Sequence, residues 1–155
     1  MRDPNRKPPP GKNPAGKRAW ARRCAAQALY QWQLTGQEPA RIATQFLADQ
    51  DLGKADPDYF RELVFKIPER AEEIDAVLAP FLDRPVSQID PVECAILRIG
   101  GYELIAHPDI AYRIVLNEAV ELAKLFGAEQ GHRFVNGVLD KVARTVRPAE
   151  IGAPP

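Results

Sequence analysis

The apolar residues of this chain recur at the three- and four-residue spacing of amphipathic α-helices, and no stretch alternates convincingly with the two-residue period of a strand. One stripe consists of Ala21, Cys24, Ala25, Ala28, Leu29 and Trp32, and a later one consists of Val115, Leu116, Ala119, Leu122, Ala123 and Phe126. The pattern predicts an all-α fold of about seven helices, in two helical halves that meet near Pro85.

Prolines mark where several of these helices begin. Asp56-Pro57 and Asp90-Pro91 each place a capping carboxylate directly before a proline at the first helical position. Glu93 stands where a capping box would need it. We therefore expect helices to start at Pro57 and Pro91.

The composition changes at both ends of the chain. Residues 1–16 hold five prolines and a basic excess, which predicts a disordered basic arm. Residues 17–147 are expected to form one helical domain, with halves at about 17–84 and 85–147. Residues 148–155, again rich in Pro and Gly, are expected to be a flexible tail.

Few features of the sequence point to catalysis, metal binding or membrane insertion. The charged, Pro-rich start is neither a secretory signal nor a membrane span, so a cytoplasmic protein is expected. Cys24 and Cys94 stand among apolar residues and are expected to be buried rather than paired. With His107 and His132 they make no zinc pattern, and no catalytic motif is present, so we expect no enzyme, cofactor or metal.

Charge is distributed very unevenly along a chain whose formal net charge is zero. Residues 1–23 carry eight basic residues and one acidic residue, whereas residues 24–130 carry nine basic and 18 acidic residues. Such asymmetry favours a polyanionic partner at the basic end and a cationic partner for the acidic middle. A solvated basic tail on an ordinary acidic domain is the alternative that charge alone leaves open.

The first helix carries a polar stripe opposite its apolar face. Arg23, Gln27 and Tyr30 fall at positions i, i+4 and i+7, and Lys17, Arg18 and Arg22 lie about one turn earlier. Cations neutralise phosphates, an amide hydrogen-bonds base edges, and a phenol ring stacks on an unpaired base. This pattern indicates an RNA-binding face, although an ordinary solvated helix face would show the same residues.

A second candidate site lies where one predicted helix ends and the last one begins. Phe126 precedes a loop bracketed by Gly127 and Gly131, and Arg133 follows in the next helix. The free N–H groups at the start of a helix attract a phosphate, and Arg133 would strengthen that attraction. From pattern alone, Phe126 is better explained as a core residue.

Several strings resemble the NusB family of transcription antitermination factors, in order over roughly residues 17–147. They are Arg23–Gln33 (RCAAQALYQWQ), Gln45–Leu47 (QFL), Tyr59–Arg61 (YFR), Leu97–Ile99 (LRI), Asn117–Lys124 (NEAVELAK), Phe126–Ala128 (FGA) and Phe134–Lys141 (FVNGVLDK). The resemblance implies an all-helical fold of two packed bundles. It also implies binding of boxA RNA together with NusE, a small-subunit ribosomal protein, within an RNA polymerase antitermination complex that transcribes ribosomal RNA.

Carried onto this sequence, the resemblance implies an RNA surface made of Lys17, Arg18, Arg22, Arg23, Gln27, Tyr30, Phe126 and Gln130, to which the helix-start argument adds Arg133. Some family members carry an acidic residue where this chain has Gln130, and a neutral side chain there should favour RNA modestly. The resemblance places the protein-partner surface on the second half, at Phe81 and Glu93.

Two other functions are compatible with the sequence. NusB-like domains also occur fused to RNA methyltransferases as substrate-binding accessories, although this chain has no strands from which to build a nucleotide-type cofactor fold. A protein-interaction scaffold without RNA contact would equally use the acidic middle. The sequence leaves open whether the free protein is a monomer or a homodimer.

Overall fold

The computed structural model describes residues 14–49, 52–126 and 131–152, and the parts it describes contain helices and no strand. The α-helices are α1 (Pro14–Thr35), α2 (Pro39–Asp49), α3 (Pro57–Glu69), α4 (Ala71–Leu78), α5 (Pro91–Ala106), α6 (Tyr112–Leu125), α7 (Gly131–Val146) and α8 (Pro148–Ile151). Two short 3₁₀ helices, η1 (Ala79–Phe81) and η2 (Val86–Gln88), connect α4 to α5. The all-α prediction is confirmed.

Local sequence accounts for the helix ends that were predicted. The Asp56 carboxylate accepts hydrogen bonds from the N–H groups of Asp58 and Tyr59 over 3.0 and 3.1 Å, and Pro57 begins α3. Asp90 caps α5 in the same way, with Pro91 as its first residue. At the end of α1, Gly36 adopts a φ of 68° and donates to the Trp32 carbonyl over 2.9 Å, a conformation that favours glycine.

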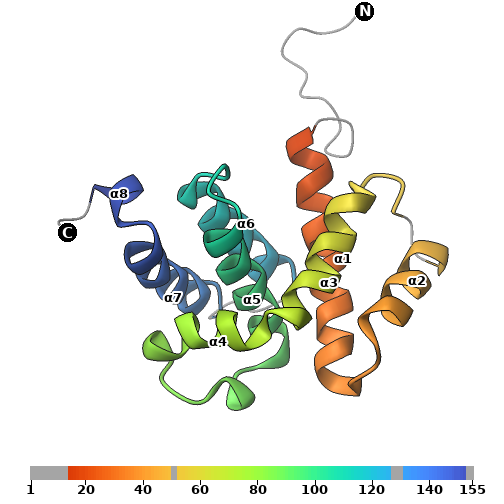
Figure 1. Cartoon of the computed structure of the whole chain (residues 1–155), viewed down its shortest axis with the longest axis horizontal. Coiled ribbons are helices and arrows are strands. Elements are labelled where there is room, and N and C mark those ends of the chain that lie inside the picture. The colour runs from red at the N-terminus through yellow and green to blue at the C-terminus, as the bar shows by residue number, and fades with distance from the viewer. Residues whose placement is uncertain (1–13, 50–51, 127–130, 153–155) are drawn as a thin grey trace, which may run out of the picture.

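The helices form two groups that share one core (Figure 1). The N-terminal group consists of α1–α3, and the C-terminal group consists of α4–α7. Helix α1 packs on both α3 and α5, so it joins the groups. Helix α4 packs against α5 and α7 although it precedes residue 85, so the packing boundary lies earlier than the predicted halves.

Close helix approach within the C-terminal group depends on two consecutive glycines of α5. A Cβ built on Gly100 would lie 2.5 Å from Cδ1 of Leu139 on α7, and one on Gly101 would lie 3.2 Å from Ile74 on α4. Most of α5 is buried, in keeping with its central position. Cys24 and Cys94 are both buried, as predicted.

Both chain ends differ from the prediction where the structure describes them. Helix α1 already begins at Pro14, so part of the predicted 1–16 arm is helical, and residues 1–13 lie outside the described residues. The predicted flexible tail begins instead with α8, because Glu150 accepts the Tyr112 N–H over 2.8 Å and pairs with Arg147 over 3.0 Å. These contacts fasten the last described turn to the start of α6.

Candidate nucleic-acid interface

A cleft of about 450 Å³ opens between the two helix groups. Its lining comes from α1, α2, the first turn of α5 and the end of α6, and consists of Ala26, Gln27, Tyr30, Gln31, Leu34, Thr35, Phe46, Val92 and Phe126. The structure thus brings Gln27 and Tyr30 of the predicted stripe together with Phe126 of the predicted loop site. These residues are about 100 positions apart in the chain.

The helical repeat of α1 explains why Gln27 and Tyr30 face this cleft. At about 100° per residue they lie on the side opposite Ala25 and Leu29, which are fully buried. Gln27 is exposed and Tyr30 is 39% exposed, so both present polar atoms and ring surface to solvent. The cleft is therefore amphipathic, with aromatic walls and an amide at its edge.

Phe126 ends α6 as its C-terminal cap. Its N–H donates to the Leu122 carbonyl over 3.0 Å, and its half-buried ring packs against the core while also lining the cleft. Phe126 therefore packs against the core and also lines the cleft, and its contact with RNA stays a prediction. The predicted cap Gly127 and the candidate Gln130 lie outside the described residues.

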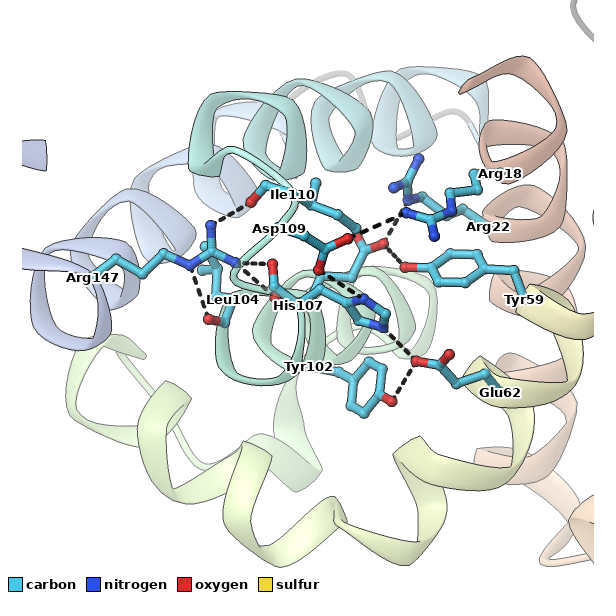
Figure 2. A network of polar contacts seen from close by, with 11 residues as sticks. Arg18, Arg22, Tyr59, Glu62, Tyr102, Leu104, His107, Asp109, Ile110 and Arg147 are labelled. Atoms are coloured by element: carbon cyan, nitrogen blue, oxygen red, sulfur yellow. Dashed lines mark hydrogen bonds and ion pairs between the residues drawn. The ribbon is translucent and has the colours of Figure 1, made fainter. Parts of the chain in front are cut away.

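The predicted basic residues of α1 do not form one stripe. Arg23 is half-buried on the cleft side of the helix, whereas Arg18 and Arg22 lie on the side facing α3 and α5 (Figure 2). The exposed Lys17 lines a separate pocket with Arg18 and Arg22. The guanidinium carbon of Arg18 lies 4.8 Å from the Tyr59 ring centroid, and its Nη1 lies 3.9 Å from Oδ2 of Asp109. The Arg18 side chain remains 39% exposed and so stays accessible.

The interpretation of Arg22 as an exposed RNA contact is wrong. Its Nε donates to Oε2 of Glu103 over 2.8 Å, and only 3% of the residue is exposed. Burial lowers its pKa, but the charge and hydrogen bond of Glu103 outweigh burial and raise the pKa overall. Arg22 is a buried partner of α5, and it leaves the predicted RNA surface.

The same carboxylate receives a second donor. The Tyr59 hydroxyl hydrogen-bonds Glu103, and burial together with this carboxylate raises the Tyr59 pKa. Glu118 of α6 lies 3.8 Å from Arg22, and its pKa is raised by burial despite that nearby cation. The cluster joins α1, α3, α5 and α6.

A neighbouring set of contacts joins α3 to the end of α5 (Figure 2). Tyr102 donates to Glu62 over 2.6 Å, and the same carboxylate hydrogen-bonds Nε2 of His107. Burial raises the Glu62 pKa, but the hydrogen bonds from Tyr102 and His107 lower it further than burial raises it. The other ring nitrogen of His107 lies 3.5 Å from Asp109.

Arg147 satisfies backbone carbonyls in the last turn of α5 and just after it. Its guanidinium donates to Leu104 over 3.0 Å, to Glu103 over 2.9 Å and to His107 over 2.6 Å, and it also bonds Ile110. These polar groups hydrogen-bond or pair with one another and so support the packing of the helices that carry them.

Three further predicted residues lie away from the cleft lining. Arg133 is exposed in the first turn of α7, as a phosphate contact would require. Phe81 of η1 and Glu93 of α5, the predicted partner residues, are both half-buried on the C-terminal group. Burial, with a smaller contribution from Asp90, raises the Glu93 pKa.

Sequence reasoning missed the partners of Arg22 and the apolar residues that line the cleft beside Tyr30 and Phe126, among them Leu34, Phe46 and Val92. Glu103 offered a signal, because a carboxylate within the apolar Ile99–Leu104 run of a helix needs a buried cation. Among residues 14–49, 52–126 and 131–152, no cluster of His, Cys, Asp or Glu is arranged to hold a metal ion. None of the helices in those ranges is long and apolar enough to cross a bilayer.

Comparison with known proteins matches this chain to one family. The NusB family model covers residues 20–144. Transcription antitermination protein NusB of Nitrosococcus oceani is 57% identical over 136 residues, which cover 88% of this chain and 91% of that protein. The Idiomarina loihiensis protein of the same name is 50% identical over 135 residues, covering 87% of this chain and 96% of the relative.

Solved structures show the same fold. A structure of the antitermination factors NusB and NusE in complex with dsRNA matches with a TM-score of 0.72 and 28% identity, over 82% of this chain and 96% of the matched chain. NusB of T. maritima matches with a TM-score of 0.72 at 24% identity, over 95% of this chain and 99% of that one. On the family match, the relatives and the shared all-helical architecture, this chain belongs to the NusB family of transcription antitermination proteins.

Proposed function

We propose that this protein is a non-enzymatic antitermination factor that binds boxA-type single-stranded RNA together with NusE, and so supports transcription of ribosomal RNA by RNA polymerase. The observation that carries the RNA part is the cleft in which Gln27 and Tyr30 of α1 meet Phe126 of α6. The solved relative that holds NusE and RNA supports the choice of partners.

The cleft offers each kind of contact that an unpaired nucleotide needs. The rings of Tyr30 and Phe126 provide surfaces on which bases stack, and the Gln27 amide hydrogen-bonds base edges. Arg23, on the same side of α1, supplies charge for the phosphates, and the exposed Lys17 adds a cation outside the cleft lining. Arg133, exposed in the first turn of α7 and seven residues after Phe126 in the sequence, is proposed as a further phosphate contact.

NusE is proposed to bind the C-terminal group, at Phe81 and Glu93. The 18 acidic residues of the 24–130 segment against nine basic residues complement a basic ribosomal protein. RNA and NusE should bind with a coupling free energy of about 1–3 kcal/mol, and the coupling must be reciprocal. RNA that leaves NusE affinity unchanged would contradict this part of the proposal.

The RNA part is tested by titrating a boxA-type oligonucleotide at several salt concentrations. The slope of log K against log salt should be about −0.7 for each phosphate contact. Tyr30→Ala should weaken binding by about 1–3 kcal/mol, since stacking on one ring contributes that much. Arg144→Ala removes an exposed cation of α7 outside the cleft lining and serves as the matched control.

Two results would reject RNA binding in the cleft. One is an affinity that does not respond to salt. The other is a Tyr30→Ala variant that binds as tightly as the Arg144→Ala control. A protein that binds NusE normally and shows no measurable affinity for the RNA would be an interaction scaffold without RNA contact.

A further inference from the structure

Trp20 of α1 lies against two cations that come from different parts of the chain. The guanidinium carbon of Arg23, one turn along α1, is 4.7 Å from the indole centroid. Nζ of Lys54, in the segment between α2 and α3, is 5.3 Å from the same ring. Trp20 and Arg23 are half-buried and Lys54 is exposed, so the charges are held by a fixed ring but remain open to solvent.

The charge of this Trp20–Arg23–Lys54 cluster is not neutralised by the carboxylates that the structure describes. Arg18 and Arg22, on the opposite side of α1, lie within 4.0 Å of Asp109 and Glu103 respectively, whereas neither Arg23 nor Lys54 forms an ion pair within the described residues. Two cations on one aromatic ring repel each other, and the ring offsets only part of that repulsion. An anion placed between them would relieve it.

The cluster continues the proposed RNA cleft along α1. At about 100° per residue, Trp20, Arg23, Gln27 and Tyr30 fall within an arc of about 80° on the helix surface. Trp20 and Tyr30 are ten residues apart, a distance of about 15 Å along the axis. One helix face therefore leads from the base-stacking end at Tyr30 to the cationic end at Trp20.

We propose that the Trp20–Arg23–Lys54 cluster is a second RNA subsite, which holds backbone phosphates of the nucleotides that flank the segment in the cleft. Arg23 and Lys54 contact the phosphates, and Trp20 is the positioning residue that fixes both cations. The contacts are to the backbone, so the subsite extends the bound length without reading sequence. This inference rests on the proposed RNA-binding function.

The test uses two RNAs, the minimal boxA-type element and the same element with a few nucleotides added on each side. Wild-type protein should bind the extended RNA several-fold more tightly, with a steeper salt dependence. Lys54→Gln should abolish most of that gain and reduce the magnitude of the salt slope on extended RNA by about 0.7. Its affinity for the minimal element should remain that of the wild type.

Matched variants separate the subsite from general charge and from folding. Lys66→Gln removes an exposed lysine of α3 that pairs with Glu69, and it should keep the full gain from the flanks. Trp20→Leu removes the ring but no charge, and it should lose part of the gain because the cations are no longer fixed. Lys54 is exposed, so its substitution should leave the thermal midpoint unchanged.

The outcomes distinguish this subsite from the function on which it rests. If wild-type protein binds neither RNA, the proposed function and the subsite both fail. If binding of the minimal element depends on Tyr30 but the flanks add nothing, only the subsite is overturned. The subsite is also overturned if Lys54→Gln and Lys66→Gln bind the extended RNA with the same affinity.

Discussion

Arg22 on α1 donates to Glu103 on α5 over 2.8 Å, and these side chains are 4% and 1% exposed. The pair connects the N-terminal group to the C-terminal group at a point from which water is excluded. A charge that is buried with a partner is tolerated, but the same charge without its partner is costly. We therefore expect this pair to contribute to the stability of the packing between α1 and α5.

Removing one member of the pair should destabilise the protein strongly. Glu103→Leu leaves Arg22 buried with Glu118 at 3.8 Å as its remaining carboxylate, and we expect a loss of about 3–5 kcal/mol in the free energy of unfolding. Urea denaturation measures it. The double variant Arg22→Met with Glu103→Leu should recover most of the loss, and a double variant as unstable as Glu103→Leu would contradict a penalty for unpaired charge.

Glu62 should make the free energy of unfolding depend on pH in the acidic range. Its folded pKa lies below the usual 4.5, so its contribution is present above 4.5 and is lost as pH falls through the lower folded value. The free energy of unfolding of Glu62→Gln should be below that of the wild type at neutral pH. The difference should shrink in acid, and a difference constant through this range would refute the linkage.

Two helical glycines should respond oppositely to the same substitution. Gly100→Ala places a Cβ 2.5 Å from Cδ1 of Leu139 and should cost about 1–3 kcal/mol, since α7 must give way. Gly137→Ala on α7 meets nothing within 4 Å and should stabilise the protein by about 0.5–1 kcal/mol. Thermal denaturation of the two variants compares them directly, and equal shifts would show that packing at Gly100 is not limiting.

Those features that depend on neighbours in sequence were predictable. Each cap needs only a carboxylate two or three residues before the N–H groups from which it accepts hydrogen bonds. The caps at Asp56 and Asp90 were both found where expected. The amphipathic stripes likewise gave the all-α class, because helix periodicity is local. The start of α8 was missed because Glu150 is stabilised by Tyr112, which lies 38 residues away.

The candidate site was predictable only in part. Gln27 and Tyr30 share one helix face by spacing alone, but their meeting with Phe126 depends on how α1 packs against the end of α6. Arg22 was misassigned although helical spacing places it on the side of Ala25 and Leu29, and its partner Glu103, 81 residues later, is brought to it by tertiary packing. The position of Lys54 beside Trp20 is likewise a result of tertiary packing.

Arg147 should not be replaceable by lysine. Its planar guanidinium serves several carbonyls at once, among them those of Glu103, Leu104 and His107, and a lysine ammonium has neither the reach nor the fork geometry to do so. We expect Arg147→Lys to lower the free energy of unfolding by about 1–3 kcal/mol through buried carbonyls left unpaired. Arg144→Lys, at an exposed position on α7, is the control and should be neutral in the same denaturation experiment.

The cleft between Tyr30 and Phe126 takes its walls from both helix groups, with α1 and α2 on one side and α5 and α6 on the other. A ligand in this cleft contacts both groups and so binds the form in which they are packed together. Its binding should therefore raise the free energy of unfolding of the whole molecule. RNA should then slow amide hydrogen exchange in α5 and α6 well away from the cleft. A substitution at Glu103, which does not line the cleft, should weaken RNA binding by loosening the groups.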